Sequence, residues 1–173
     1  MDFLQLIRQR RSVRKFRPQT IEQEKVDLLK EAALRSPSGR NLRPWHFAFV
    51  TNREQIDKLA VAKVHGSQLI KTSTLAVVVY CQLNTSDTWV EDCSIASIYL
   101  QLAVEELGLG SCWVQIRQRM HNDTVTANDY VKQVLELPNE CNVESIIAIG
   151  YSDQEKVPVP FTDLNYDKIT VYK

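Results

Sequence analysis

The feature that most constrains this fold is the segment 90–107, whose helical period leaves almost no polar face. Its apolar side chains surround the predicted helix, and only a narrow polar stripe remains, made of Ser94, Ser97, Gln101 and Glu105. A helix on the surface of a domain usually exposes a broad polar face. The segment therefore predicts a helix that lies in the centre of a domain or against another subunit.

Four apolar runs predict strands. Residues 75–81 form a continuous run rich in valine, which is typical of a strand buried on both faces, and residues 145–151 have the same character. Residues 45–51 and 111–116 predict two further strands. A few strands among several helices in 173 residues indicate an α+β fold, or an α/β fold with irregular strand order.

Capping residues predict where the helices begin. Asp2 is placed to cap a first helix, and Thr20 with Gln23 forms a capping box for a second. Two further helices are expected over residues 52–63 and 124–137, and the C-terminal tail is expected to be extended. We find no repeat, low-complexity tract or linker, so residues 1–173 are expected to form one domain.

The chain lacks the sequence features of secreted, membrane-spanning and zinc-binding proteins. No apolar run approaches about 20 residues and no signal-type segment is present, so we expect a cytoplasmic protein. The cysteines form no close pair and lie far from the histidines, so we expect buried, reduced thiols and no metal site. They are Cys81, Cys93, Cys112 and Cys141.

Charge is distributed unevenly along a chain whose formal net charge is zero. The first fifty residues carry eleven Lys and Arg side chains against five Asp and Glu side chains, and the rest of the chain carries the balancing negative charge. An excess of cations confined to one part of a neutral chain indicates a local anion site rather than a generally basic surface for nucleic acid.

The densest cationic motif is Arg10-Arg11-Ser12-Val13-Arg14. Guanidinium groups and a hydroxyl that converge from one short segment suit a phosphate, which offers three acceptor oxygens. Arg10, Ser12 and Arg14 alternate, so in an extended segment they point the same way. A solvated basic edge that deters strand pairing is an alternative, and a nuclear-localisation or nucleic-acid patch is a third interpretation.

A second polar loop follows the expected second helix and leads through Pro44 into the strand 45–51. It can offer backbone and side-chain donors to a polar ligand, whereas a generic turn without function is the alternative interpretation. Its donors belong to Ser38, Gly39, Arg40, Asn41 and Arg43.

No motif for catalysis by side chains is present. Residues 108–113 start like a dinucleotide loop, but Trp113 replaces the third glycine, and the loop follows a helix and precedes a strand, which reverses the order in that motif. We identify no set of nucleophile, base and orienting acid, so we assign no catalytic side chain. This absence is typical of an enzyme whose cofactor performs the chemistry.

Four segments together resemble the FMN-dependent nitroreductase family, in family order and over nearly the whole chain. The resemblance implies an α+β fold with a mixed central sheet flanked by helices, and an intertwined homodimer with each FMN in a groove between subunits. It also implies that the long apolar helix forms much of the dimer interface and that the tail reaches over the partner. The segments are Arg10-Arg11-Ser12-Val13-Arg14, Pro37-Ser38-Gly39-Arg40-Asn41 running into Pro44-Trp45-His46-Phe47, Gly108-Leu109-Gly110-Ser111-Cys112-Trp113, and Ser145-Ile146-Ile147-Ala148-Ile149-Gly150-Tyr151.

The same resemblance implies cofactor-binding roles. Arg10, Ser12 and Arg14, with Arg11 beside them, would hold the FMN phosphate and the pyrimidine side of the flavin. Lys156 would supply a late cation for the phosphate. Larger members of the family often have a C-terminal Lys-x-Arg pair, which this chain lacks, and the substrate-covering insertion of longer members is not expected here.

Two further parts of the chain would meet the flavin ring. The second polar loop would reach it from the other subunit, and a strand end would pass along the isoalloxazine with a backbone N–H near N5. Either Lys63 or Gln68 would contact the flavin carbonyls. The residues of the loop are Ser38, Gly39, Arg40, Asn41 and Arg43, and those of the strand end are Trp113, Val114 and Gln115.

The activity implied is ping-pong reduction of a small-molecule acceptor, such as a nitroaromatic or quinone, with NADH or NADPH as donor. Two alternatives remain at this point. A flavoprotein of the same fold could catalyse dehydrogenation, dehalogenation or flavin breakdown, and a non-enzymatic module could use the basic segment to bind nucleic acid or another anion. The hypothesis of an FMN-dependent oxidoreductase predicts neither a nucleic-acid partner nor a membrane partner.

Overall fold

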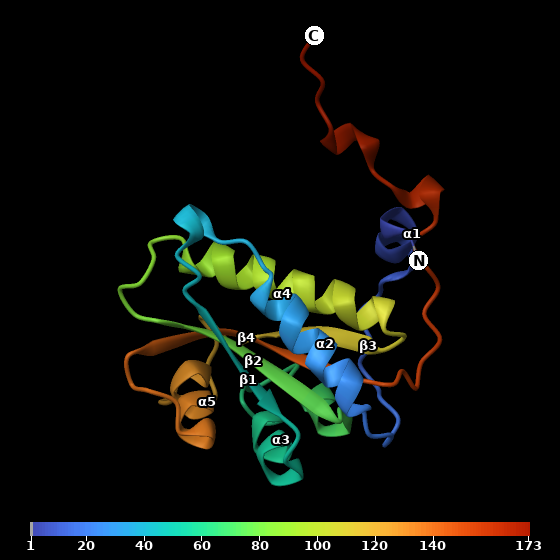
Figure 1. Cartoon of the computed structure of the whole chain (residues 1–173). Helices are drawn as coiled ribbons and strands as arrows, with labels where there is room; N and C mark the ends of the chain where they lie inside the picture. The colour runs from blue at the N-terminus through green and yellow to red at the C-terminus, as the bar shows by residue number, and fades with distance from the viewer. Residues whose placement is uncertain (1) are drawn as a thin grey trace.

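The computed structural model describes residues 2–173, in which helices cover both faces of a four-stranded sheet (Figure 1). This arrangement confirms the predicted α+β fold. In chain order, the helices and strands are α1 (Phe3–Gln9), α2 (Gln23–Leu34), β1 (Trp45–Val50), α3 (Arg53–Leu59), β2 (Leu75–Gln82), α4 (Trp89–Glu106), β3 (Gly110–Gln115), α5 (Ala127–Leu135) and β4 (Cys141–Gly150). Short 3-10 turns lie at Gly39–Asn41, Gln68–Thr72, Phe161–Asp163 and Tyr166–Lys168.

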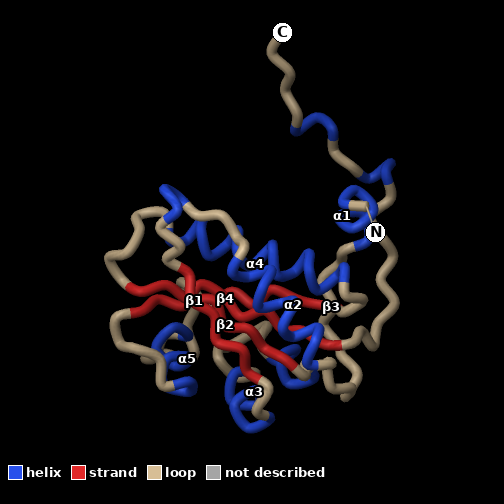
Figure 2. Tube along the Cα trace, in the orientation of Figure 1, coloured by secondary structure: helices blue, strands red, loops and turns tan. Residues whose placement is uncertain are grey.

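The strands lie in the order β1-β2-β4-β3, and every neighbouring pair is antiparallel. Figure 2 shows the four strands gathered in one layer between the helices. β2 and β4 occupy the centre, where helices cover both faces, and this position explains their continuously apolar sequences. Within residues 2–173, the parallel pairing of the expected mixed sheet is limited to one isolated bridge, between Ser12 and Ser111 at the outer edge of β3.

The sheet separates two hydrophobic clusters. On one face, Leu29 of α2 and Leu100 of α4 pack in the same cluster as Val77 of β2. On the other face, Ile56 of α3 and Val131 of α5 belong to the second cluster. All but Ile56 are fully buried, and each such aliphatic side chain contributes about 2 kcal/mol to folding. The side chains of each central strand alternate between these two clusters.

Helix α4 is the long apolar helix expected from the sequence, and it packs centrally over the sheet (Figure 1). Its sheet-facing side is buried, with Leu100 and Val104 fully inaccessible. The opposite side carries an apolar strip that one chain leaves open: Ile95, Ile98 and Tyr99 are 38%, 39% and 42% exposed. The predicted burial of this helix in the domain is thus confirmed. The exposed strip remains available to pack against another surface.

Of the two predicted helix caps, that of Asp2 is confirmed and that of Thr20 is wrong. Asp2 Oδ1 accepts the Gln5 N–H at 2.9 Å, and Asn52 caps α3 in the same way. The Thr20 capping box does not form, because α2 begins at Gln23 after Glu22, which makes no side-chain cap bond.

Other element ends differ by a few residues from those expected. α3 ends at Leu59 rather than near residue 63, and α5 begins at Ala127, where the Thr126 side chain accepts the Asp129 N–H. β4 begins earlier than expected, at Cys141, because its first residues pair with the end of β2.

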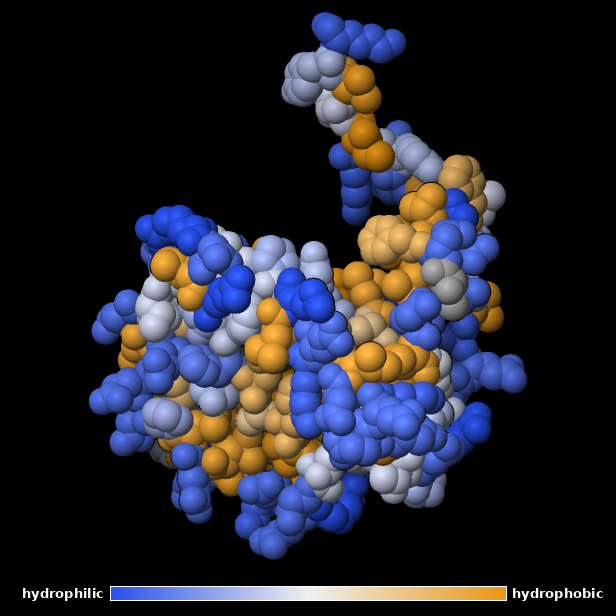
Figure 3. Space-filling model, viewed as in Figure 1, coloured by the Kyte–Doolittle hydropathy of each residue, from blue (hydrophilic) through white to orange (hydrophobic). Residues whose placement is uncertain are grey.

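The tail after β4 passes beside α1 and then stands clear of the body (Figures 1 and 3). It is extended apart from two 3-10 turns, as predicted. It exposes many apolar side chains, and Figure 3 shows them along its length. They belong to Val157, Val159, Phe161, Leu164, Tyr166, Ile169, Val171 and Tyr172.

All four cysteines are free and buried, as predicted. Across residues 2–173, no helix has both the length and the apolar character needed to cross a bilayer.

Candidate functional site

Residues 10–17, the arginine segment, run along the outer edge of β3 and are held there by the backbone. Val13 N–H donates to the Ser111 carbonyl at 2.9 Å, and Arg17 N–H donates to the Tyr151 carbonyl at 2.8 Å. Val13 and Phe16 are buried. These two side chains anchor the segment in the core, so Arg14 between them and the arginines on either side are held near the surface.

Two glycines permit this close approach. A Cβ on Gly110 would lie 2.8 Å from Val13 Cγ2, and a Cβ on Gly150 would lie 3.0 Å from Phe16 Cβ. The absence of side chains there lets the arginine segment lie directly against the ends of β3 and β4. Gly110 therefore serves the packing of the arginine segment, which no dinucleotide motif would explain.

The arginine segment, α1 and the tail together line a cavity of about 860 Å³. None of the described residues that line it carries a carboxylate, so the cations around it are balanced by no acid within the cavity. Such a concentration of uncompensated positive charge favours an anionic ligand. The polar lining is Arg8, Arg10, Arg11, Ser12, Arg14 and Lys156, and the apolar lining is Ile7, Pro158, Val159, Phe161, Leu164 and Tyr166.

The cavity thus brings together Arg10, Arg11, Ser12, Arg14 and Lys156, five residues singled out in the sequence. Arg11 Nη1 also donates to the Val157 carbonyl at 2.7 Å, which ties the start of the tail to the segment. Arg8 was not singled out, although its place two residues before the motif was a usable signal.

Positive charge continues from this cavity along the edge of the sheet to Lys63. Burial raises the pKa of the Cys112 thiol, and the charges of Arg14 and Lys63 act against that rise, so both cations lie near this residue of β3. Burial lowers the pKa of Lys63, and the charge of Arg119 lowers it further. Gln68, the other residue suggested for a flavin carbonyl, instead accepts the Gly66 N–H at 2.9 Å.

The outer edge of β3 presents backbone donors. Because the Ser111 carbonyl faces outward to Val13, and alternate residues of an antiparallel strand direct their backbone to the same side, the N–H groups of Trp113 and Gln115 face that edge. The Val114 side chain is fully buried in the core. It lies on the opposite face from Trp113, so it supports the strand and does not reach the edge site.

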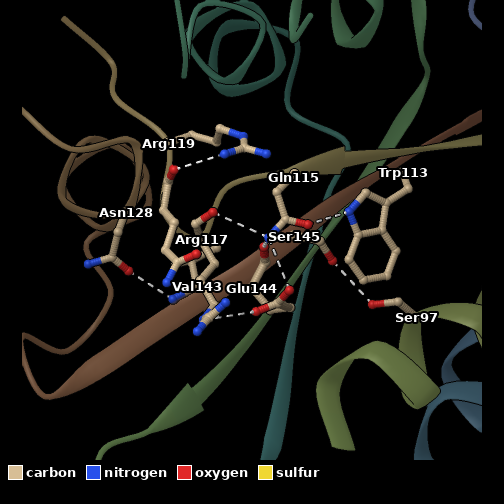
Figure 4. Close-up of polar contacts among 10 residues, drawn as sticks. Ser97, Trp113, Gln115, Arg117, Arg119, Asn128, Val143, Glu144 and Ser145 are labelled. Atoms are coloured by element: carbon tan, nitrogen blue, oxygen red, sulfur yellow. Dashed lines mark hydrogen bonds and ion pairs between the residues drawn. The ribbon is translucent and has the colours of Figure 1, made fainter. Parts of the chain in front are cut away.

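A polar network fixes the side chain of Gln115, as Figure 4 shows. Its Oε1 accepts the Trp113 Nε1–H at 2.9 Å, and its Nε2 donates to Glu144 Oε1 at 3.1 Å. Glu144 is buried, its Oε2 makes no hydrogen bond within residues 2–173, and Arg117 Nε lies 4.0 Å from that oxygen. Burial raises the pKa of Glu144, while the Gln115 hydrogen bond and the Arg117 charge lower it.

The second polar loop, residues 38–43, forms a strained turn. Arg40, Asn41 and Arg43 have φ values of 52°, 55° and 49°, in the left-handed region. Such a conformation costs roughly 1–2 kcal/mol per non-glycine residue, and it persists only where surrounding contacts impose it. The Arg43 N–H donates to Ser38 Oγ at 2.8 Å, and Arg40 pairs with Asp87.

The 38–43 loop and the arginine segment lie at opposite ends of α4 (Figure 1). Gly39 binds Asp92 in the first turn of the helix, whereas the charge of Arg10 acts on Glu105 near its end. A helix of 18 residues is about 27 Å long. One chain therefore does not bring together Ser38, Gly39, Arg40, Asn41 and Arg43 with the cationic cavity.

Two acids that hold these regions in place were not singled out in the sequence. Asp92 lies in the first turn of α4, where an acid complements the helix dipole, and it also binds Gly39, a residue far away along the chain. Glu144 interrupts the apolar sequence of β4, and this single acid was the signal that could have identified it. In both cases the partner depends on the fold rather than on spacing.

Known proteins match this chain over most of its length. The model of the family described as "Nitroreductase family" matches residues 7–87 and 80–151. An FMN-dependent nitroreductase from Clostridium difficile R20291 superimposes with a TM-score of 0.96 at 40% identity, over 99% of each chain. A Methanothermobacter thermautotrophicus protein that carries the names NADH dehydrogenase and NAD(P)H nitroreductase is 34% identical, over 87% of this chain and 78% of its own. An iodotyrosine deiodinase from Thermotoga neapolitana is 25% identical, over 90% and 91%.

Proposed function

Because the chain belongs to the nitroreductase family, we propose that it is an FMN-dependent NAD(P)H oxidoreductase that reduces nitroaromatic, quinone or related acceptors by a ping-pong reaction. The observation that carries this proposal is the cationic cavity beside β3, which holds the arginine motif and Lys156 without any acid. It supports a phosphate-bearing cofactor rather than a substrate bound by apolar contacts alone.

The residues present fit the phosphate and the ring of FMN. Arg10, Ser12 and Arg14 offer two guanidinium groups and a hydroxyl to the phosphate, and Lys156 is the late cation that completes the cavity. Lys63 is the proposed partner of the flavin carbonyls, because it is a half-buried cation on the same edge, and Gln68 is already bonded locally. The outward N–H of Gln115 is the proposed donor to N5.

When bound, FMN would supply the redox chemistry, which is hydride transfer between a nicotinamide donor and the acceptor. The residues of the cavity would hold its phosphate, and the outer edge of β3 would offer the ring a backbone donor. No side chain is assigned as acid or base. The Trp113, Gln115 and Glu144 network keeps the strand end rigid, as pre-organisation of the site requires.

We propose that the active form is an intertwined homodimer with FMN at the subunit interface, each subunit a single domain over residues 1–173. The exposed strip of α4 and the apolar tail offer the surfaces for this assembly. In it, the 38–43 loop of one subunit, with Ser38, Gly39, Arg40, Asn41 and Arg43, serves the cavity of the other. Dependence on NAD(P)H supports a cytoplasmic location.

Cofactor binding tests the site. We compare the wild-type protein with a variant that carries Arg10→Ala and Arg14→Ala, and titrate FMN into each apoprotein. Loss of two charge-assisted contacts is expected to raise the Kd by about 100-fold. The matched control removes two exposed cations, Lys30→Ala in α2 and Arg35→Ala directly after it, which pair with acids of that helix. Equal FMN affinity in all three proteins would refute the phosphate assignment.

Turnover tests the reaction. The purified protein is expected to show flavin absorption and to reduce a nitroaromatic with NADH or NADPH. An FMN-loaded protein that is inert to both donors contradicts the reductase proposal. Iodotyrosine belongs in the same assay, because a deiodinase is among the relatives. A colourless protein with strong, salt-dependent binding to polynucleotide supports the non-enzymatic alternative instead.

A further inference from the structure

We propose that Asp92 is a positioning residue that holds the 38–43 loop in the conformation needed to reach FMN in the partner subunit. The inference rests on the proposed function, in which that loop completes the other subunit's site. It adds a residue to which neither the family match nor the sequence motifs gives a role.

Asp92 is a buried carboxylate, 2% exposed, whose two oxygens are occupied by two different loops. Oδ1 accepts the Gly39 N–H at 2.7 Å. Oδ2 accepts the Ser86 Oγ–H at 3.3 Å and the Thr88 Oγ1–H at 3.2 Å. Hydrogen bonds to a charged, buried acceptor are stronger than neutral ones, so this is the firmest tie of the loop to the body.

Gly39 is required at this contact for reasons of space. A Cβ on Gly39 would lie 2.7 Å from Thr88 Oγ1 and 3.7 Å from Asp92 Oδ1. A side chain at position 39 would therefore force Thr88 or the loop itself to shift where the loop meets the start of α4. Glycine at position 39 thus permits the close approach in which its N–H reaches Asp92.

The strain in the loop makes this tie necessary. Arg40, Asn41 and Arg43 hold left-handed backbone angles that the chain would leave if it were free to do so. Its other ties are weaker: the ion pair from Arg40 to Asp87 is exposed on both sides, with side chains 66% and 76% accessible. Release of Gly39 from Asp92 therefore lets the loop relax away from its observed shape.

The same carboxylate also fixes the space beside the loop. A cavity of about 640 Å³ lies beside the loop and is lined by Arg40, Leu42 and residues 81–87. Asp92 binds Gly39, the neighbour of Arg40 in the chain, and also Ser86 in the cavity lining, so it holds these two parts of the chain together. Helix α4 thereby carries at its start the anchor for a loop that acts in a different subunit.

The test measures FMN affinity in graded variants. Asp92→Ala removes both acceptor oxygens and is expected to raise the FMN Kd by about tenfold. Asp92→Asn keeps one acceptor for Gly39 and is expected to raise it by about threefold. The matched control is Glu91→Gln, an exposed acid in the same helical turn, which is expected to stay within about twofold of the wild type.

Loop position is measured separately from folding. Trypsin is expected to cut after Arg40 faster in Asp92→Ala than in Glu91→Gln, under conditions where both apoproteins remain folded by circular dichroism. If Asp92→Ala does not fold, Gly39→Ala replaces it, and the double variant Gly39→Ala with Thr88→Ala is expected to bind FMN more tightly than Gly39→Ala because the close contact is removed.

Mixed dimers show which subunit the loop serves. We combine Asp92→Ala subunits with subunits that carry Arg10→Ala and Arg14→Ala, using two affinity tags. If the loop acts in the partner's site, one of the two sites combines an unmutated arginine segment with an unmutated loop and binds FMN with wild-type affinity. If it acts in its own subunit, both sites are damaged and wild-type affinity is absent from the mixed dimer.

The outcomes separate the two proposals. Unchanged FMN affinity in the double arginine variant overturns the proposed function. Weakened affinity in that variant, together with equal affinity in Asp92→Ala and Glu91→Gln, leaves the proposed function intact and overturns the role of Asp92. A mixed dimer without a wild-type site likewise overturns the role of Asp92 in the partner's site.

Discussion

The two cationic parts of the molecule are held in place by different means. The arginine segment is bonded to β3 and β4 through its backbone, with Val13 and Phe16 inserted into the core. Within residues 2–173, the 38–43 loop pairs with no strand, and it is tied to the body by the buried carboxylate of Asp92 and by the exposed ion pair between Arg40 and Asp87. The arginine segment is therefore as stable as the sheet, whereas the loop can move without unfolding the protein.

This difference suits the two proposed tasks. A phosphate site gains affinity from donors that are fixed before the ligand arrives, because no ordering cost is incurred on binding. A loop that must enter another subunit's groove has to form its final contacts during assembly. Three predictions test whether the two regions differ in this way.

The largest effect is expected where the arginine segment meets the sheet. Gly110→Ala places a Cβ 2.8 Å from Val13 Cγ2, so the segment must shift away from β3. We expect the free energy of unfolding to fall by about 2 kcal/mol, as in other overpacked cores, and FMN to bind more weakly because Ser12 moves. Urea denaturation and FMN titration measure the two effects.

Gly108→Ala is the matched control for this change. Gly108 has φ of +71° but open space where a Cβ would stand. The left-handed backbone is expected to cost about 1 kcal/mol of stability, with FMN affinity unchanged. An equal loss of FMN affinity in both variants would show that the arginine segment is not held in place by its close approach to Gly110.

An intermediate effect is expected in amide hydrogen exchange. The Val13 N–H bonds to a strand carbonyl, whereas the Arg43 N–H bonds to the Ser38 hydroxyl in an exposed loop. We expect the Val13 amide to exchange at least about tenfold more slowly than that of Arg43. Nuclear magnetic resonance of the apoprotein measures both sites, and similar protection at the two amides would remove the distinction between the regions.

The smallest effect is expected from the ion pair between Lys15 and Asp153, 2.9 Å apart at the surface. The Lys15 hydrogen bond, and then its charge, lower the pKa of Asp153 below the usual value of 3.8. A lowered acid pKa stabilises the fold above the usual value, and this contribution is lost as the pH falls through the folded value. Acid should therefore weaken this tie of the arginine segment.

Thermal unfolding at about pH 6 and about pH 3, with Asp153→Asn as the comparison, measures this contribution. The wild type is expected to lose slightly more stability on acidification than the variant, and the difference should shrink in high salt because both side chains are exposed. A larger acid loss in Asp153→Asn would contradict the assignment.

The sequence predicted an element correctly where the residues of that one segment were enough to identify it. The valine-rich run of β2 and the apolar period of α4 identify their elements without knowledge of any neighbour. Element ends were less predictable, because tertiary contacts decide them. The Tyr151 hydroxyl donates to Glu22 at 2.6 Å and holds that residue outside the helix, so α2 begins later than the Thr20 pattern predicts.

The residues of the site could likewise be predicted only where neighbours in the chain act together. The arginine motif could be recognised because its cations are adjacent in the chain, and the fold places them in one cavity. The late start of α5 and the role of Asp92 could not be recognised. Asn122 Oδ1 accepts the N–H groups of Thr124 and Val125 and so delays the helix, and Asp92 meets Gly39 only after α4 and the loop have docked.

The placement of the two cationic regions at opposite ends of α4 has a consequence for mass action. If each cofactor needs one region from each subunit, flavin binding and subunit association are a single linked equilibrium. Dilution of the protein then releases flavin, and addition of flavin holds the subunits together at concentrations where the apoprotein separates. In such a dimer, the length of one helix would make cofactor retention depend on how much of the protein is present.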